Sequence, residues 1–146
     1  MIGTHGRHLL VEYMGCNPST LNSLDRIKSL MKAAAKAANT TIVTSTFKPF
    51  DPQGVSGVVV IEESHLSIHT WPEVGYAAVD FYTCGKGEPE KAHEVLLMGL
   101  EATEHELIRV ERGRIEESTR MQVDLWERTL PEEWASLIRT SGSTSA

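Results

Sequence analysis

Apolar residues recur along the chain in runs that predict six β-strands. The run of residues 58–61 is continuously apolar and β-branched, which is typical of a strand buried on both faces. The other runs are rich in Val, Ile, Thr and aromatic residues and end at Gly or Pro. The predicted strands are residues 7–13, 40–47, 55–62, 65–71, 76–84 and 106–111.

Two further stretches follow a helical period. Apolar residues at helical spacing predict an amphipathic helix over residues 20–38, preceded by a turn over residues 15–19 that offers a cap. A second helix is expected from Pro89 to about Ala102, since Pro is favoured at the first helical position. The element order predicts an α+β two-layer sandwich, an antiparallel sheet with helices on one face. The second face also carries large apolar groups, so we expect it to pack on another copy.

The C-terminal part of the chain has a different character. We expect a folded domain over residues 1–113 and an extension over residues 114–146, with a polar linker at residues 115–121. The apolar residues from Leu125 to Ile138 predict a short helix started by Pro131, whose tryptophans dock on the domain or on a partner chain. Composition predicts disorder for the final Ser-Gly-Ser-Thr-Ser-Ala.

Composition and charge narrow the class of protein. A chain of 146 residues suits one domain, and 20 acidic against 14 basic residues without a basic stripe argue against nucleic acid as a partner. No apolar run approaches the roughly 20 residues that span a bilayer, and the N-terminus lacks a signal-peptide core, so we expect a cytoplasmic protein. There, Cys16 and Cys84 are expected as free thiols, not as a disulfide.

The most unusual stretch is Glu62-Glu63-Ser64-His65, which follows an apolar strand with no Gly or Pro between. The Ser64 hydroxyl can attack the carbonyl of Glu63 and convert the amide into an ester. Loss of the Ser64 α-proton then expels the Glu63 carboxylate, and the remaining dehydroalanine hydrolyses to a pyruvoyl group. This chemistry requires a strained bond, an oxyanion donor and a base, and the neighbourhood contains candidates for each.

Simpler interpretations exist for several of these residues. His65 and His69 would share a metal ion on a helix, but on a strand their spacing is roughly 13 Å, so no metal site is expected. Cys84 alone could be a small core residue, although its place at a strand end before Gly85 weakens that interpretation. Glu73 could be a solvated charge in a hairpin.

Three segments resemble the prokaryotic S-adenosylmethionine decarboxylase proenzyme family: Thr-Ile-Val-Thr-Ser-Thr-Phe, residues 54–73 and residues 75–85. The resemblance covers about residues 6–113 and rests above all on Glu-Ser-His-Leu-Ser-Ile-His-Thr-Trp-Pro-Glu. It implies cleavage between Glu63 and Ser64, which gives chains 1–63 and 64–146. The second chain then begins with a pyruvoyl group made from Ser64.

The resemblance also implies roles for other residues. Ser56 and His69 match the processing pair, with Ser56 helping to hold the oxyanion and His69 taking the α-proton. Cys84 matches the proton donor for the decarboxylated carbanion. Phe50 matches an aromatic residue that stacks on adenine, and Glu73 matches the carboxylate that binds the ribose hydroxyls.

The implied activity is decarboxylation of S-adenosylmethionine, which forms a Schiff base with the pyruvoyl group and releases carbon dioxide. The product is the aminopropyl donor of spermidine biosynthesis, and no metal or added cofactor is implied. The family's dimer is a four-layer αββα sandwich. Two departures concern the substrate pocket or assembly: the C-terminal extension, and Val74 where an aromatic residue is often found. Alternatives are a pyruvoyl-dependent arginine or ornithine decarboxylase and an unprocessed binding or regulatory protein of the same fold.

Strand parity adds an independent expectation. Ser64 and His69 are five residues apart, so on one continuous strand they face opposite sides, although a break at the cleavage point could relax this. We therefore expect composite active sites, two per dimer. Ser64 and Cys84 come from one protomer, and Ser56, His69, Glu73 and Phe50 come from its partner.

Overall fold

The structure is a computed structural model that describes residues 3–115, 118–119 and 121–129. The elements in chain order are β1 (Gly6–Met14), α1 (Pro18–Leu21), α2 (Leu24–Ala37), β2 (Ile42–Pro49), β3 (Val55–Ile61), β4 (Ser64–Trp71), the 3₁₀ turn η1 (Pro72–Val74), β5 (Tyr76–Cys84), α3 (Pro89–Gly99), β6 (Glu104–Arg112), β7 (Arg114–Ile115), β8 (Ser118–Thr119) and β9 (Gln122–Thr129).

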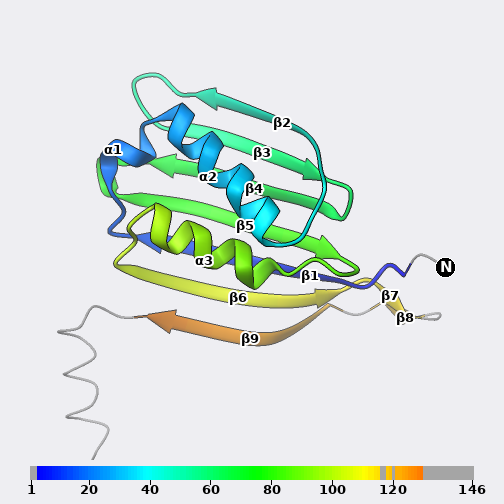
Figure 1. The fold of residues 1–146 in the computed structure, drawn as a ribbon. Coiled ribbons are helices and arrows are strands. Elements are labelled where there is room, and N and C mark those ends of the chain that lie inside the picture. The colour runs from blue at the N-terminus through cyan, green and yellow to red at the C-terminus, as the bar shows by residue number, and fades with distance from the viewer. Residues whose placement is uncertain (1–2, 116–117, 120, 130–146) are drawn as a thin grey trace, which may run out of the picture.

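Seven strands form one antiparallel sheet in the order β2-β3-β4-β5-β1-β6-β9 (Figure 1). The helices α2 and α3 run side by side over one face of this sheet, and the other face carries no helix in the described part of the chain (Figure 1). The predicted two-layer α+β fold is thus confirmed. Within the described ranges, no helix is long and apolar enough to cross a bilayer.

The core lies between the sheet and the helices because the strands alternate in polarity. On β1, Leu9, Val11 and Tyr13 are fully or almost fully buried, whereas Leu10 between them is 45% exposed on the open face. The core side chains come from all of the central elements. The largest are Tyr13, Phe81, Leu9, Leu21, Ile27, Met31, Leu66, Ile68, Leu96 and Leu100. Each buried aliphatic side chain stabilises the fold by about 1.5–3 kcal/mol.

The helix predicted over residues 20–38 is divided in two. Asn17 caps α1 through a hydrogen bond from the Ser19 amide, as the predicted turn implied. The chain then leaves the helical path, and the Ser23 hydroxyl accepts from the Arg26 amide to cap α2. The side chain of Asn22, between the two helices, accepts from the amide of Gly54 and so links this break to the β2–β3 loop. A short break between two caps leaves the helical spacing of apolar residues almost unchanged, so the pattern does not reveal it.

The extension departs from prediction where the structure describes it. Instead of a linker, β7 and β8 form a small ladder, and β9 then pairs along β6 and extends the main sheet beyond residue 113. Leu125 and Trp126, expected with the tail helix, lie in β9, with Trp126 68% exposed. The cause is the free edge of β6, whose backbone groups hydrogen-bond to a strand of mostly polar residues. The predicted helix from Pro131 lies outside the described residues.

Candidate active site

Ser64 begins β4, in the middle of the sheet, with an unusual backbone. Its φ is +149°, a region that residues with a Cβ rarely adopt and that costs on the order of 1–3 kcal/mol. The residue directly follows the tight β3–β4 turn and pairs with Ile61 and Thr83 on its two sides. The surrounding ladder therefore holds the backbone of Ser64, next to the Glu63–Ser64 bond, in a strained conformation.

The groups around this bond have defined partners. The Ser64 hydroxyl lies 3.5 Å from the thiol of Cys84, and the backbone N–H of Cys84 donates to the carbonyl oxygen of Glu63 at 3.0 Å. The Glu63 carboxylate in turn accepts from the amide of Thr41 at 3.0 Å. The carbonyl that a Ser64 attack would convert to an oxyanion thus already accepts a hydrogen bond from a backbone donor.

The space beside Cys84 is kept by a glycine. A Cβ on Gly6 of the neighbouring strand β1 would lie 2.6 Å from Cε1 of Tyr82 and 3.0 Å from the Cys84 sulfur. Burial and a hydrogen bond with the Cys84 thiol raise the pKa of Tyr82, so this phenol stays protonated at neutral pH. Cys84 is half-buried and forms no disulfide.

A second pair lies further along the same strands. Ser56 on β3 is in register with His69 on β4, and the Ser56 hydroxyl lies 2.6 Å from Nδ1 of His69. His69 is shared by two hollows of about 240 and 270 Å³. The first also includes Ser56 and Lys48, and the second includes Phe50 and Trp71. Phe50 is 53% exposed beside the second hollow.

Between the two pairs, a polar network crosses the open face of the sheet around Asp80 of β5. His8 and His65 contact Oδ2 of Asp80 through Nε2 at 2.6 and 3.1 Å, and the Ser67 hydroxyl donates to the other oxygen. Burial alone would raise the pKa of Asp80, but hydrogen bonds from His8, Ser67 and His65 lower it to about 2. This carboxylate is therefore a fixed negative charge at the centre of the open face.

The predicted site residues thus fall into two groups on one chain. Ser64 lies with Cys84, and Ser56 lies with His69 and Phe50. Five residues of extended strand, about 16 Å, separate Ser64 from His69.

One predicted site residue lies away from both groups, and three features near the site were not predicted. Glu73 is exposed on η1 and makes no hydrogen bond with another described residue. The backbone N–H of Cys84, the Gly6 spacer and the Asp80 network were not predicted. Hydrophobic patterning cannot find them, because they depend on pairings between distant strands.

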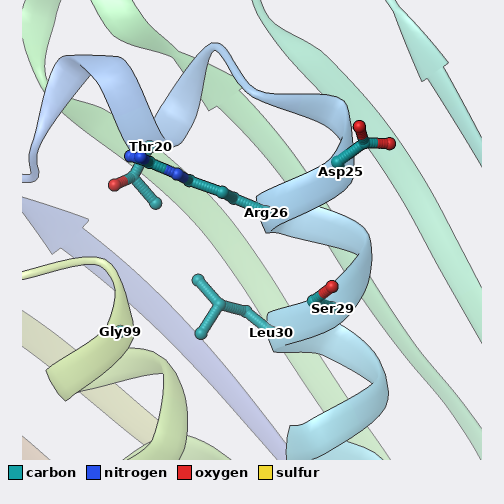
Figure 2. Close-up of a pocket in the computed structure, with 6 residues that line it drawn as sticks. All are labelled: Thr20, Asp25, Arg26, Ser29, Leu30 and Gly99. Carbon is teal, nitrogen blue, oxygen red and sulfur yellow. The ribbon is translucent and has the colours of Figure 1, made fainter.

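A third hollow, larger than the two beside His69, lies away from the open face. It measures about 470 Å³ and lies in the helix layer, with α1 and α2 on one side and the end of α3 on the other (Figure 2). Figure 2 shows Leu30 pointing toward Gly99, Arg26 extending toward Thr20, and Asp25 turned away. Its lining includes the hydroxyls of Thr20 and Ser29 but no thiol or imidazole, so the chemistry is assigned to β4 and its neighbours.

The fold and these groups define a small enzyme of the two-layer α+β class. A model of the S-adenosylmethionine decarboxylase family matches residues 7–113. The S-adenosylmethionine decarboxylase proenzyme of Thermotoga petrophila is 52% identical over 113 residues, which are 77% of this chain and 87% of the relative. That of Thermococcus gammatolerans is 45% identical over 132 residues, 88% of this chain and 92% of the relative.

A solved structure shows the same likeness. The crystal structure of the adenosylmethionine decarboxylase from Aquifex aeolicus matches with a TM-score of 0.73 at 36% identity, over 81% of this chain and 98% of that one. The chain therefore belongs to the S-adenosylmethionine decarboxylase family.

Proposed function

We propose that this chain is a proenzyme that cuts its own Glu63–Ser64 bond and then decarboxylates S-adenosylmethionine. The observation that carries the proposal is the arrangement at that bond. Ser64 has a strained backbone with a φ of +149°, and the carbonyl of Glu63 accepts a hydrogen bond from the Cys84 N–H. The relatives' name, proenzyme, agrees with a chain that is made in an inactive form.

Processing begins when Oγ of Ser64 attacks the carbonyl carbon of Glu63. The C–N bond breaks, the hydroxyl proton passes to the nitrogen, and an ester replaces the amide, while the Cys84 N–H stabilises the charge on the carbonyl oxygen. A base then removes the α-proton of Ser64, and Glu63 leaves as a carboxylate. Water replaces the nitrogen, ammonia is released, and a pyruvoyl group remains at the start of chain 64–146.

We assign the α-proton to His69 of the partner subunit. Within one chain, His69 lies about 16 Å from Ser64, too far for direct proton transfer. Its imidazole is instead oriented by the Ser56 hydroxyl at 2.6 Å. A second copy packed on the open face can bring this pair to Ser64, with Ser56 helping to hold the oxyanion, and two such sites then form in each dimer.

The exposed apolar groups of the open face support this dimer. Leu10 is 45% exposed, Val60 37% and Trp126 68%, and strand alternation places all three on the face opposite the helices. Packing two such faces together gives a four-layer αββα sandwich. The Asp80 network would then lie inside the interface, where Asp80 keeps its contacts with His8 and His65.

In the decarboxylation step, the pyruvoyl group would supply a carbonyl that condenses with the substrate amine and delocalises the electron pair that stays on the substrate carbon when carbon dioxide leaves. Cys84, already in contact with the side chain of residue 64, donates the proton that replaces the carboxylate. Phe50, beside the hollow that it shares with His69, stacks on the adenine ring. Glu73, exposed on η1, accepts hydrogen bonds from the ribose hydroxyls.

A substrate screen tests the activity. Purified protein is incubated separately with S-adenosylmethionine, arginine and ornithine, and released carbon dioxide is measured. We expect release from S-adenosylmethionine only, and Ser64→Ala protein, which cannot form the pyruvoyl group, serves as the blank. Release from arginine or ornithine instead would establish the alternative substrate class. Because the named relatives are S-adenosylmethionine decarboxylases, they favour the first outcome.

A further inference from the structure

Two histidines are buried together on the helix side of the sheet, away from the candidate active site. His93 of α3 is 8% exposed and His105 of β6 is 6% exposed, and their ring centroids are 4.9 Å apart. Burying two histidines lowers the stability of the fold unless their ring nitrogens have hydrogen-bond partners or a ligand. The proposed decarboxylase mechanism uses neither of them.

A third ligand, a carboxylate, joins the pair from the extension. Glu127 of β9 places Oε1 3.1 Å from Nε2 of His105, and one ring nitrogen of His93 lies within 4.8 Å of both atoms. The Glu127 side chain is 52% exposed, so the cluster has an opening to solvent through this carboxylate. Two imidazoles and one carboxylate are a ligand set that proteins use for zinc, with a fourth position left for water.

Tyr13 supplies the outer contact that such a site needs. Its hydroxyl lies 2.7 Å from Nδ1 of His93 and 3.4 Å from the His93 carbonyl oxygen. If Tyr13 donates to that carbonyl and accepts from Nδ1–H, Nε2 of His93 keeps its lone pair for an ion. A histidine that binds metal ordinarily donates its other N–H in this way. Burial is the main cause that raises the pKa of Tyr13, so its hydroxyl stays protonated.

We propose that His93, His105 and Glu127 form a binding site for one divalent transition-metal ion such as Zn²⁺. Around a zinc ion at 2.0–2.1 Å, tetrahedral ligand atoms lie roughly 3.3 Å apart, so ligand atoms that lie within 4.8 Å of one another need to approach by at most about 1.5 Å. The ion joins three elements that are distant in sequence: α3, β6 and the extension strand β9.

Two described clusters carry ligand types suited to such an ion. The second of these clusters, His8, His65 and Asp80, differs in the contacts that its ring nitrogens already make. Both of its imidazole Nε2 atoms already contact the same carboxylate oxygen of Asp80, whereas in the other cluster only His105 contacts the carboxylate of Glu127. The His93 cluster is therefore the better candidate.

The test is zinc binding by the full-length, untagged protein after removal of metal with a chelator. We expect one Zn²⁺ per chain by titration calorimetry, and a visible absorption band of tetrahedral Co²⁺ when cobalt replaces zinc. Glu127→Gln is the main variant because its side chain is exposed and the change preserves shape. We expect it to weaken zinc binding by at least about 10-fold. Zinc should also raise the unfolding midpoint of the wild type and much less that of this variant.

A matched control separates this site from general acidity of β9. Asp124 lies on the same strand but bonds to Nε of Arg109 at 2.9 Å, so Asp124→Asn should leave zinc affinity unchanged. The proposal is overturned if zinc binds wild type and Glu127→Gln equally, or if Asp80→Asn, rather than Glu127→Gln, abolishes binding. It is also overturned if no binding occurs at micromolar zinc. None of these readouts depends on decarboxylase activity, so they do not rise or fall with the proposed function.

Discussion

The composite active site predicts that two inactive variants restore each other. Ser64→Ala protein has no nucleophile, and His69→Ala protein lacks the base, so neither should form a pyruvoyl group alone. In a mixed dimer, one site combines Ser64 of the His69→Ala chain with His69 of the Ser64→Ala chain. The separation of about 16 Å along β4 means that no single chain can substitute for this pairing.

The expected yield follows from the symmetry of the dimer. Random pairing of equal amounts puts about half of the His69→Ala chains in mixed dimers, where one site is complete, so about half of them should be processed. Ser64→Ala chains should stay whole, which makes processed chain about a quarter of the total. The two proteins are co-expressed with different tags and the products are measured by intact mass. The pyruvoyl chain is lighter by the mass of ammonia than a chain with N-terminal serine.

Two results would refute this reasoning. One is a mixture in which no chain acquires the pyruvoyl mass although mixed dimers are recovered through both tags. The other is processing of His69→Ala protein on its own at the level of the mixture. Co-expressed wild-type and Ser64→Ala chains are the control, since wild-type chains have a complete site in either kind of dimer.

Three further predictions concern the surroundings of the site. Gly6→Val places carbon atoms against Tyr82 and the Cys84 sulfur, so it should slow carbon dioxide release at least about 10-fold. Gly3→Val is the control and should match wild type, because nothing lies within 4 Å of the added Cβ. Equal rates for the two variants would contradict the described packing around Cys84. In the folded protein the pKa of Asp80 is lowered from 3.8 to about 2, so its ionised carboxylate adds about 2 kcal/mol to the free energy of unfolding above pH 4. This contribution is lost as the pH falls toward 2. In urea unfolding, the deficit of Asp80→Asn should therefore shrink on acidification, and a constant deficit would argue against the network. Truncation after Gly113 removes β9 and exposes the edge of β6, so it should lower the free energy of unfolding by roughly 2 kcal/mol. An unchanged urea midpoint would contradict a stabilising role of β9.

Much of the fold could be predicted from the sequence because local patterns determine it. The continuous apolar run of β3 and the alternation of β1 both indicate strands, and in both strands one face is buried under the helices; the second face of β3, with Val60 37% exposed, lies on the open side of the sheet. The helical period of α2 is similarly local, with Ile27 and Met31 on the buried side. Pro72 and Gly75 also marked the hairpin turn, where Gly75 adopts a φ of +65°.

The parts that escaped prediction depend on long-range pairing. β9 is mostly polar, and only its ladder with the edge of β6 makes it a strand. The φ of Ser64 and the Cys84 N–H at the Glu63 carbonyl arise where β4 meets β5, twenty residues away in sequence. His93, His105 and Glu127 come from three elements, and no local spacing connects them. Sites whose residues come from several strands therefore cannot be predicted from local sequence patterns, whereas the motif around Ser64 is contiguous and can be recognised in the sequence.

The most direct test of the account is the intact mass of freshly purified wild-type protein under denaturing conditions. We expect two fragments, residues 1–63 and residues 64–146, the second lighter by the mass of ammonia than its sequence predicts and able to react with a hydrazine. A single uncut chain of 146 residues, or a second fragment that begins with ordinary serine, would contradict the proposal that this protein makes its own catalytic group.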